Sequence, residues 1–208
     1  MKIDRTELKK QLRKWIRQGY IQPEEIPDID LYVEQLIRFM DRFLSGYKRS
    51  EDDKTLTKTM VNNYTKNELI PPSNNKRYGS DHVILLILIY YMKNVISISD
   101  IRTVLEPLVQ DYEKGEGRKY SLEEIYKTLY GFEKQQYFNT ENSILKTLEL
   151  AEKNSGAGED EYLNNFLFLC LLGYDIFTKR KMMEHIIDSM REEREEKPAK
   201  EKKPPKKE

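Results

Sequence analysis

A short polar stretch between residues 57 and 66 carries the side chains best suited to contact a polyanion. It offers carboxamides, hydroxyls and ammonium groups, from Asn62, Asn63, Thr57, Thr59, Thr65, Lys58 and Lys66. A helix that enters the DNA major groove needs short polar side chains outside and apolar residues three or four positions apart behind them. Met60, Val61 and Tyr64 supply that apolar spacing. The stretch therefore predicts a DNA-contacting helix, without excluding an ordinary solvated one.

Each polar side chain has a role that its chemistry permits. Asn62 and Asn63 can pair with adenine edges, and Thr57, Thr59 and Thr65 can bond phosphates or touch thymine methyl groups. Lysine side chains neutralise phosphates. The expected contacts are Thr57, Lys58, Thr59, Asn62, Asn63, Lys66, Lys76, Arg77 and Tyr78, and the two tyrosines Tyr64 and Tyr78 are expected mainly to pack.

Positive charge is local to this region. The chain has 36 Lys and Arg and 36 Asp and Glu among 208 residues, so its formal net charge is zero. Residues 54–78 hold five cations and one anion, which gives plus four. Any attraction to nucleic acid must therefore come from this segment.

The asparagine pairs also have purely structural interpretations. Asn62-Asn63 can cap or bend a helix, and Asn74-Asn75 is favoured as a tight turn, since asparagine tolerates positive φ. The turn follows Pro71-Pro72, where a helix cannot continue. A short hairpin is predicted over residues 71–78.

The polar helix and the turn segment 71–78 need other helices to position them. Apolar spacing predicts a helix from Arg5 to Gln18 that ends at Gly19, and a second, capped by Asp28 or Asp30, that ends near Gly46. Thr55 or Thr57 is expected to cap the polar helix. Ser80 or Asp81 caps the next helix, which runs to Met92, and another opens at Ser97 and is expected to end or kink at Pro107.

Beyond residue 117 the pattern predicts a bundle. A capping box at Ser121 starts a helix to about Gln136, and further helices are expected over 140–153, 162–172 and from there to about 195. Residues 196–208 lack apolar periodicity and are expected to be disordered. The predicted units are 1–27, 28–112, 118–195 and 196–208.

Residues 60–101 resemble the DNA-binding unit of MerR-family regulators. The resemblance lies in a helix ending in Leu69-Ile70-Pro71-Pro72, the Arg77-Tyr78 pair of a wing, and Ser97-Ile98-Ser99-Asp100-Ile101 opening a later helix. The sequence departs from that family at Asn62 and Asn63, where Arg and Tyr are usual, and at Glu68, where Gly is usual. The resemblance implies an all-α winged helix-turn-helix with a short β-hairpin wing, followed by a C-terminal helical bundle.

The chain also resembles an uncharacterised family of bacterial proteins with a domain of unknown function, over most of residues 25 to 190. The segments 56–64 and 95–101 carry this resemblance most clearly. It implies no activity.

Enzyme signatures are missing from the sequence. His82 and His185 are far apart and are expected at the surface, Cys170 is expected to be a buried thiol, and no phosphate loop or nucleophile elbow occurs. A non-enzymatic protein without cofactor or metal is expected. The N-terminus lacks a secretory pattern and no apolar run spans a bilayer, so a cytoplasmic protein is expected.

The expectation is thus a sequence-specific transcription regulator that binds double-stranded DNA, with a possible homodimer through the C-terminal helices and an unknown effector. A winged-helix protein-interaction module without DNA binding is the first alternative. A small-ligand sensor built on Tyr120, Tyr126, Tyr130 and Tyr137 is the second, although these tyrosines also suit packing.

Overall fold

The computed structural model describes residues 3–19, 21–112, 119, 121–154 and 160–201. It is 76% helical, as expected for an all-α chain, and has one small two-stranded sheet. The elements in order are α1 (Arg5–Gly19), η1 (Pro23–Glu25), β1 (Leu31–Tyr32), α2 (Val33–Leu44), η2 (Ser45–Tyr47), α3 (Lys58–Lys66), β2 (Arg77–Tyr78), α4 (Ser80–Met92), α5 (Ile98–Tyr112), α6 (Leu122–Asn154) and α7 (Glu161–Glu201). No helix among the described residues is long and apolar enough to cross a bilayer.

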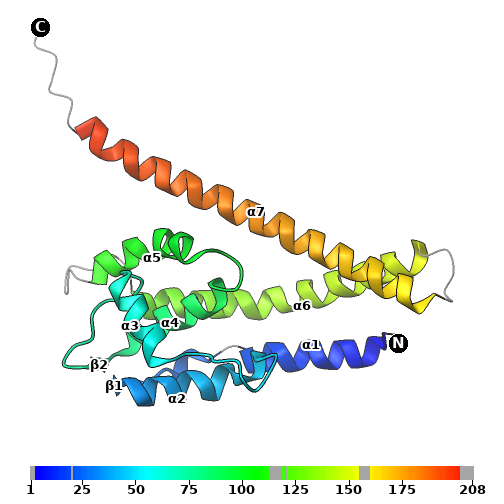
Figure 1. The fold of residues 1–208 in the computed structure, drawn as a ribbon, viewed down its shortest axis with the longest axis horizontal. Helices are drawn as coiled ribbons and strands as arrows, with labels where there is room; N and C mark the ends of the chain where they lie inside the picture. Colours follow the sequence, from blue (N-terminus) through cyan, green and yellow to red (C-terminus); the bar gives the residue numbers. More distant parts are fainter. Residues whose placement is uncertain (1–2, 20, 113–118, 120, 155–159, 202–208) are drawn as a thin grey trace, which may run out of the picture.

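Helix α4 lies at the centre of the main core. In Figure 1, α1 and α2 run along one side of α4 and α6, and α5 and α7 lie on the other side. Seven of the thirteen residues of α4 are buried, on all sides of the helix. A helix that is apolar all round must be covered all round. The segments before and after α4 therefore pack around it.

The sheet differs from the expected hairpin. Strand β2 pairs antiparallel with β1, so Leu31 lies opposite Tyr78 and Tyr32 opposite Arg77. The strand partner of the wing thus precedes α2, about 45 residues earlier in the chain. The expected tight turn is present, because Asn74 and Arg77 bond each other reciprocally, at 3.0 and 2.9 Å. Its left-handed residues are Asn75 (φ 49°) and Lys76 (φ 63°), the pattern of a type I′ turn.

Helix α3 begins and ends at well-defined caps. Thr57 is the N-cap, and its hydroxyl oxygen accepts a hydrogen bond from the Met60 amide at 3.1 Å. Thr55, the other candidate, is buried and donates to Asp41. At the far end Leu69 N–H donates to the Tyr64 carbonyl and Glu68 N–H to Thr65, which is a Schellman motif. Glu68 takes the left-handed position at φ 57°.

The C-terminal helices are longer than the pattern predicts. Helix α6 passes through residues 136–140, and α7 passes through Gly173 and reaches Glu201, into the segment expected to be disordered. Residues 202–208 lie outside the described residues. Glycine costs about 1 kcal/mol in a helix interior and proline about 3 kcal/mol, and tertiary packing outweighs both here. Helix α5 likewise continues through Pro107.

Cys170 is exposed, not buried as expected. Helix α7 packs on α6 through one side only, where Phe168, Leu171 and Leu172 join a second apolar cluster with Leu148. Cys170 lies off that side. An apolar run in sequence therefore does not make a helix buried all round.

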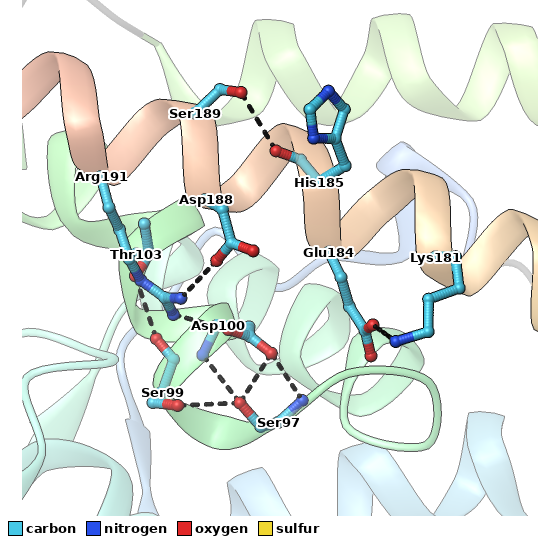
Figure 2. Close-up of polar contacts among 10 residues, drawn as sticks. All are labelled: Ser97, Ser99, Asp100, Thr103, Lys181, Glu184, His185, Asp188, Ser189 and Arg191. Carbon is cyan, nitrogen blue, oxygen red and sulfur yellow. Dashed lines mark hydrogen bonds and ion pairs between the residues drawn. The ribbon is translucent and has the colours of Figure 1, made fainter.

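Two ion pairs fasten the C-terminal half of α7 to α5. Arg191 donates to Asp100 at 2.5 Å and to Thr103 at 3.0 Å, while Arg194 donates to Glu106 at 2.6 Å. Figure 2 shows that the same Asp100 carboxylate accepts from Ser97 N–H at the start of α5, while Asp100 N–H donates to the Ser97 hydroxyl, so the two residues form a capping box. The Ser97 hydroxyl, and then Arg191, lower the pKa of Asp100. The capping residue of α5 is thus also the docking point for α7.

Substituting Glu68 by Gly is expected to stabilise the fold by roughly 0.5–1 kcal/mol, because glycine adopts the left-handed C′ position without strain. The loss of the exposed Glu68–Arg102 ion pair offsets little of this gain. Urea unfolding measures the effect. Glu68→Ala is the matched control, since it loses the same carboxylate but keeps the Cβ; if Ala stabilises as much as Gly, backbone strain is not the cause.

Candidate nucleic-acid interface

The predicted contact residues of α3 lie on one side of that helix. Lys58, Thr59, Asn62, Asn63 and Lys66 are all exposed. At 100° per residue their Cα positions span an arc of about 140°. Thr57 precedes them as the half-exposed N-cap. The structure thus gathers the helical part of the predicted set on a single outward surface.

The opposite side of α3 is fixed in the main core. Val61 is fully buried and Tyr64 is 8% exposed, and both belong to the apolar cluster that contains α4. Leu69 and Ile70, which follow the helix, are buried in the same cluster. The outward side of α3 is therefore held rigidly relative to the core.

The outward carboxamides are available for a ligand. Neither the Asn62 nor the Asn63 side chain makes a hydrogen bond to another described residue. The Asn63 backbone carbonyl accepts from the Asn67 N–H at 3.0 Å and from Asn67 Nδ2 at 2.7 Å. Both residues lie inside α3, away from its caps. The capping interpretation does not hold for this pair. Asn74 begins the tight turn, in agreement with the structural interpretation of the second pair.

Two of the predicted cations, Lys58 and Arg77, each contact a residue at the start of α2. Lys58 Nζ lies 3.8 Å from Glu34 Oε1, and Arg77 Nη2 donates to the Tyr32 hydroxyl at 3.1 Å. The Arg77 guanidinium also lies over the Tyr32 ring, 5.1 Å from its centroid. Because Tyr32 and Glu34 belong to one short segment, the N-terminus of α3 and the 74–77 turn lie near each other. Sequence reasoning missed Tyr32, since no local signal links it to Arg77.

The other two cations point to solvent without an ion pair. Lys66, at the end of α3, and Lys76, in the turn, are exposed and have no carboxylate within ion-pair distance among the described residues. Arg102, which was not predicted, neutralises Glu68 beyond the end of α3. The charge of the predicted surface thus stays positive.

Tyr78 takes a different position from the rest of the predicted set. It is 7% exposed and belongs to the main core, with its ring edge-on to His82 at 5.4 Å. Its position anchors the turn, which agrees with the packing role expected for it.

His82 is buried, at 1% exposure, so the expectation of a surface histidine was wrong. It lies at the N-terminus of α4, under the turn segment. Its Nδ1 accepts from Gly79 N–H at 3.2 Å, and Nε2 lies 3.3 Å from the Pro72 carbonyl. This arrangement fits the neutral ring with its proton on Nε2. His82 thus joins the two ends of the segment that carries Lys76 and Arg77, while His185 is exposed as expected.

Burial lowers the pKa of His82 below its ordinary 6.5. Below pH 6.5 the unfolded chain binds a proton on His82 that the folded chain does not bind. The stability that neutral His82 contributes to the folded state is therefore present above pH 6.5 and is lost as the pH falls below it. We expect wild-type stability, measured by urea unfolding, to decline between pH 7.5 and 5.5. His82→Gln should flatten the decline, and His185→Gln, the matched control, should keep it. An unchanged slope in His82→Gln would contradict this assignment.

The tyrosines considered for a ligand sensor are occupied by the protein itself. Tyr126 is buried and its hydroxyl donates to the Ile21 carbonyl at 2.7 Å, while Tyr137 donates to Glu141 at 2.6 Å. Tyr130 is half-buried, and Tyr120 lies outside the described residues. The Tyr126 contact joins α6 to the segment after α1, whereas the Tyr137 contact lies within α6, and both favour the packing interpretation.

Residues 21–129 match the model of one protein family, described as Domain of unknown function (DUF1836). The match covers just over half of the 208 residues. The chain belongs to this family. The matched part begins before β1 and ends in the first turns of α6, so it includes α3, the turn and all of α4. It is shorter than the 25–190 range over which the sequence resembles a family of unknown function. No curated protein and no solved structure matches the chain.

Proposed function

We propose that this DUF1836 protein is a non-enzymatic, cytoplasmic transcription regulator that binds double-stranded DNA in a sequence-specific way. In this proposal α3 enters the major groove and residues 71–78 lie on the phosphate backbone. The observation that carries it is the single outward side of α3, where free carboxamides, hydroxyls and cations lie together over a rigid apolar back. That combination is what major-groove recognition requires.

The element order supports a MerR-like winged helix-turn-helix. Helix α2 contacts both α3 and β2, and α4 and α5 follow the turn. In the proposal α2 is the first helix of the motif, α3 the recognition helix and the 74–77 turn the tip of the wing. The connection between α2 and α3, residues 45–57, is longer than the three or four residues of an ordinary helix-turn-helix.

The roles of the polar side chains follow from their bonding states. Asn62 and Asn63 have both amide protons and the oxygen free, which is the set that adenine pairs with in the major groove. The Thr57 oxygen already accepts from Met60, but its hydroxyl proton remains available to donate to a phosphate. Lys58, Lys66, Lys76 and Arg77 neutralise phosphates.

Replacing Lys58, Lys66, Lys76 and Arg77 together by Ala is expected to weaken DNA binding by at least tenfold. Each lost phosphate contact should also reduce the slope of log affinity against log salt by about one. The duplex is first selected from a pool of random double-stranded oligonucleotides, and affinity is then measured by fluorescence anisotropy over a salt series.

A matched control removes four exposed lysines elsewhere, Lys9, Lys10, Lys14 and Lys146, with the same loss of charge. The control should bind nearly as wild type, and both variants should keep the wild-type circular dichroism. Equal weakening in both would indicate nonspecific attraction. If the selection enriches no duplex, the chain does not bind DNA, and the protein-interaction alternative replaces the proposal.

Asn62→Ala and Asn63→Ala separate base recognition from charge. Each should reduce the preference for the selected duplex over a scrambled one, by about 1–3 kcal/mol if the contact is bidentate, and leave the salt slope unchanged. Competition with scrambled duplex measures the preference. Asn67→Ala, exposed at the C-cap beyond the outward side, is the control and should keep it.

A further inference from the structure

The N-terminal half of α7 has large apolar side chains that nothing described in this chain covers. Tyr162 is 76% exposed, Leu169 66% and Ile176 63%, and every residue from 173 to 182 is exposed. Contiguous exposed apolar surface on one element usually marks an interaction site. The regular spacing of these side chains indicates what kind of partner fits.

Four of the exposed apolar side chains of α7 lie in a heptad row, whereas Tyr174, Phe177, Met182 and Ile186 lie off it. Tyr162, Phe166, Leu169, Gly173 and Ile176 follow one another at alternating steps of four and three residues. This spacing is the seam of a coiled coil. The same steps continue along α7 through Arg180, Met183, Ile187, Met190 and Arg194.

The two halves of this row have different surroundings. In the C-terminal half, Ile187 is 3% exposed and Met183 packs on the main core, while Arg194 pairs with Glu106 of α5. In the N-terminal half the chain's own contact with α6 is made by Phe168, Leu171 and Leu172, which lie on the opposite side of α7. One half of the row is therefore packed by the chain itself, and the other half faces solvent.

Gly173 lies in the middle of the exposed half. A Cβ built at Gly173 would meet no atom within 4 Å, so the chain's own packing does not require glycine there. Glycine in a helix costs about 1 kcal/mol relative to alanine. A glycine in this row leaves room for a large side chain of another helix.

We propose that a second copy of this chain covers the exposed half of the row, with the two α7 helices antiparallel and crossing at Leu169. This register places Leu169 opposite Leu169, Phe166 opposite Gly173 and Tyr162 opposite Ile176. The Phe166 ring of each copy thus packs over Gly173 of the other, and the two-fold symmetry produces this contact twice. The pairing is isologous, as a two-fold dimer requires.

Charge complementarity selects the antiparallel direction. The start of α7 is acidic, with Asp160 and Glu161, and the basic residues 179–181 lie at the far end of the exposed half, where they also pair with Asp175 and Glu184 of their own helix. Antiparallel pairing brings the acidic end of each copy alongside the basic run of the other. A parallel pair would bring each charged segment next to its own copy and would lack this pairing between acidic and basic ends.

The exposed area is adequate for a dimer. Tyr162, Phe166, Leu169 and Ile176 together expose on the order of 500 Å² of side chain per copy, more than half of the ~800 Å² per partner in a standard interface. The inference deepens the proposed function, because such a dimer would present two α3 helices to two half-sites. The dimer itself is tested without DNA.

The first test measures the mass of the full-length chain by sedimentation velocity at micromolar concentration. Wild type should sediment as a dimer and Leu169→Glu as a monomer, since the substitution places two carboxylates opposite each other. Ile186→Glu is the matched control, as Ile186 is 52% exposed but lies off the row, and it should remain dimeric. A monomeric wild type, or dissociation by the control alone, overturns the proposal. Circular dichroism verifies that each variant is folded.

The second test reads the register by disulfide cross-linking in a Cys170→Ser background. Leu169→Cys should link to itself under mild oxidation, whereas Ile176→Cys should not link to itself but should link to Tyr162→Cys when the two are mixed. Self-linking at 176 as efficient as at 169 would show a parallel pair and overturn the antiparallel register. The dimer proposal can fail these tests while DNA binding persists, and DNA binding can fail its own test while the dimer persists. Failure of the dimer proposal is therefore distinguishable from failure of the proposed function.

Discussion

Burial of α4 on all its sides is the constraint on which the rest of the structure depends. A helix with seven buried residues around its whole circumference cannot lie at a surface, so the segments before and after it must enclose it. Helix α3 contributes Val61 and Tyr64 to that enclosure, and its polar side is left outside as a consequence. The surface proposed for DNA is thus the side of α3 opposite the one that packs on the core. Its rigidity comes from the core.

The N-terminus of α4 also fixes the turn segment. His82 bonds Gly79 and Pro72, the two ends of the segment that holds the 74–77 turn, and its ring packs between Tyr78 and Tyr112. On the outer side, Arg77 stacks over Tyr32 of the neighbouring strand. A two-stranded sheet of four residues has little stability alone. Here the buried imidazole of α4 and the cation–π contact between the two strands hold the sheet in place.

The C-terminal helices show how one helix can serve two partners. Near its start, helix α7 packs against α6 with one side. Near its end it packs against α5 with another side, where Arg191 pairs with Asp100 and Arg194 with Glu106. The seam that meets α5 is continuous with the row that nothing described covers at the start. A long helix keeps its seam in register over many turns. This continuity connects the proposed dimer contact mechanically to the domain that carries α3.

Local patterns determined the approximate positions of the helices up to the start of α6, the Thr57 cap, the tight turn after the two prolines and the polar and apolar sides of α3, because each depends on residues within a few positions of one another. Only the tertiary structure decided that β1 pairs with β2, that His82 is buried and Cys170 exposed, and that α6 and α7 continue past weak breakers such as Gly173. These features depend on contacts between residues far apart in the chain, and long-range packing outweighs a local preference of about 1 kcal/mol. The sequence by itself therefore indicated which side chains to propose as DNA contacts, whereas the fold decided which of them reach the surface together.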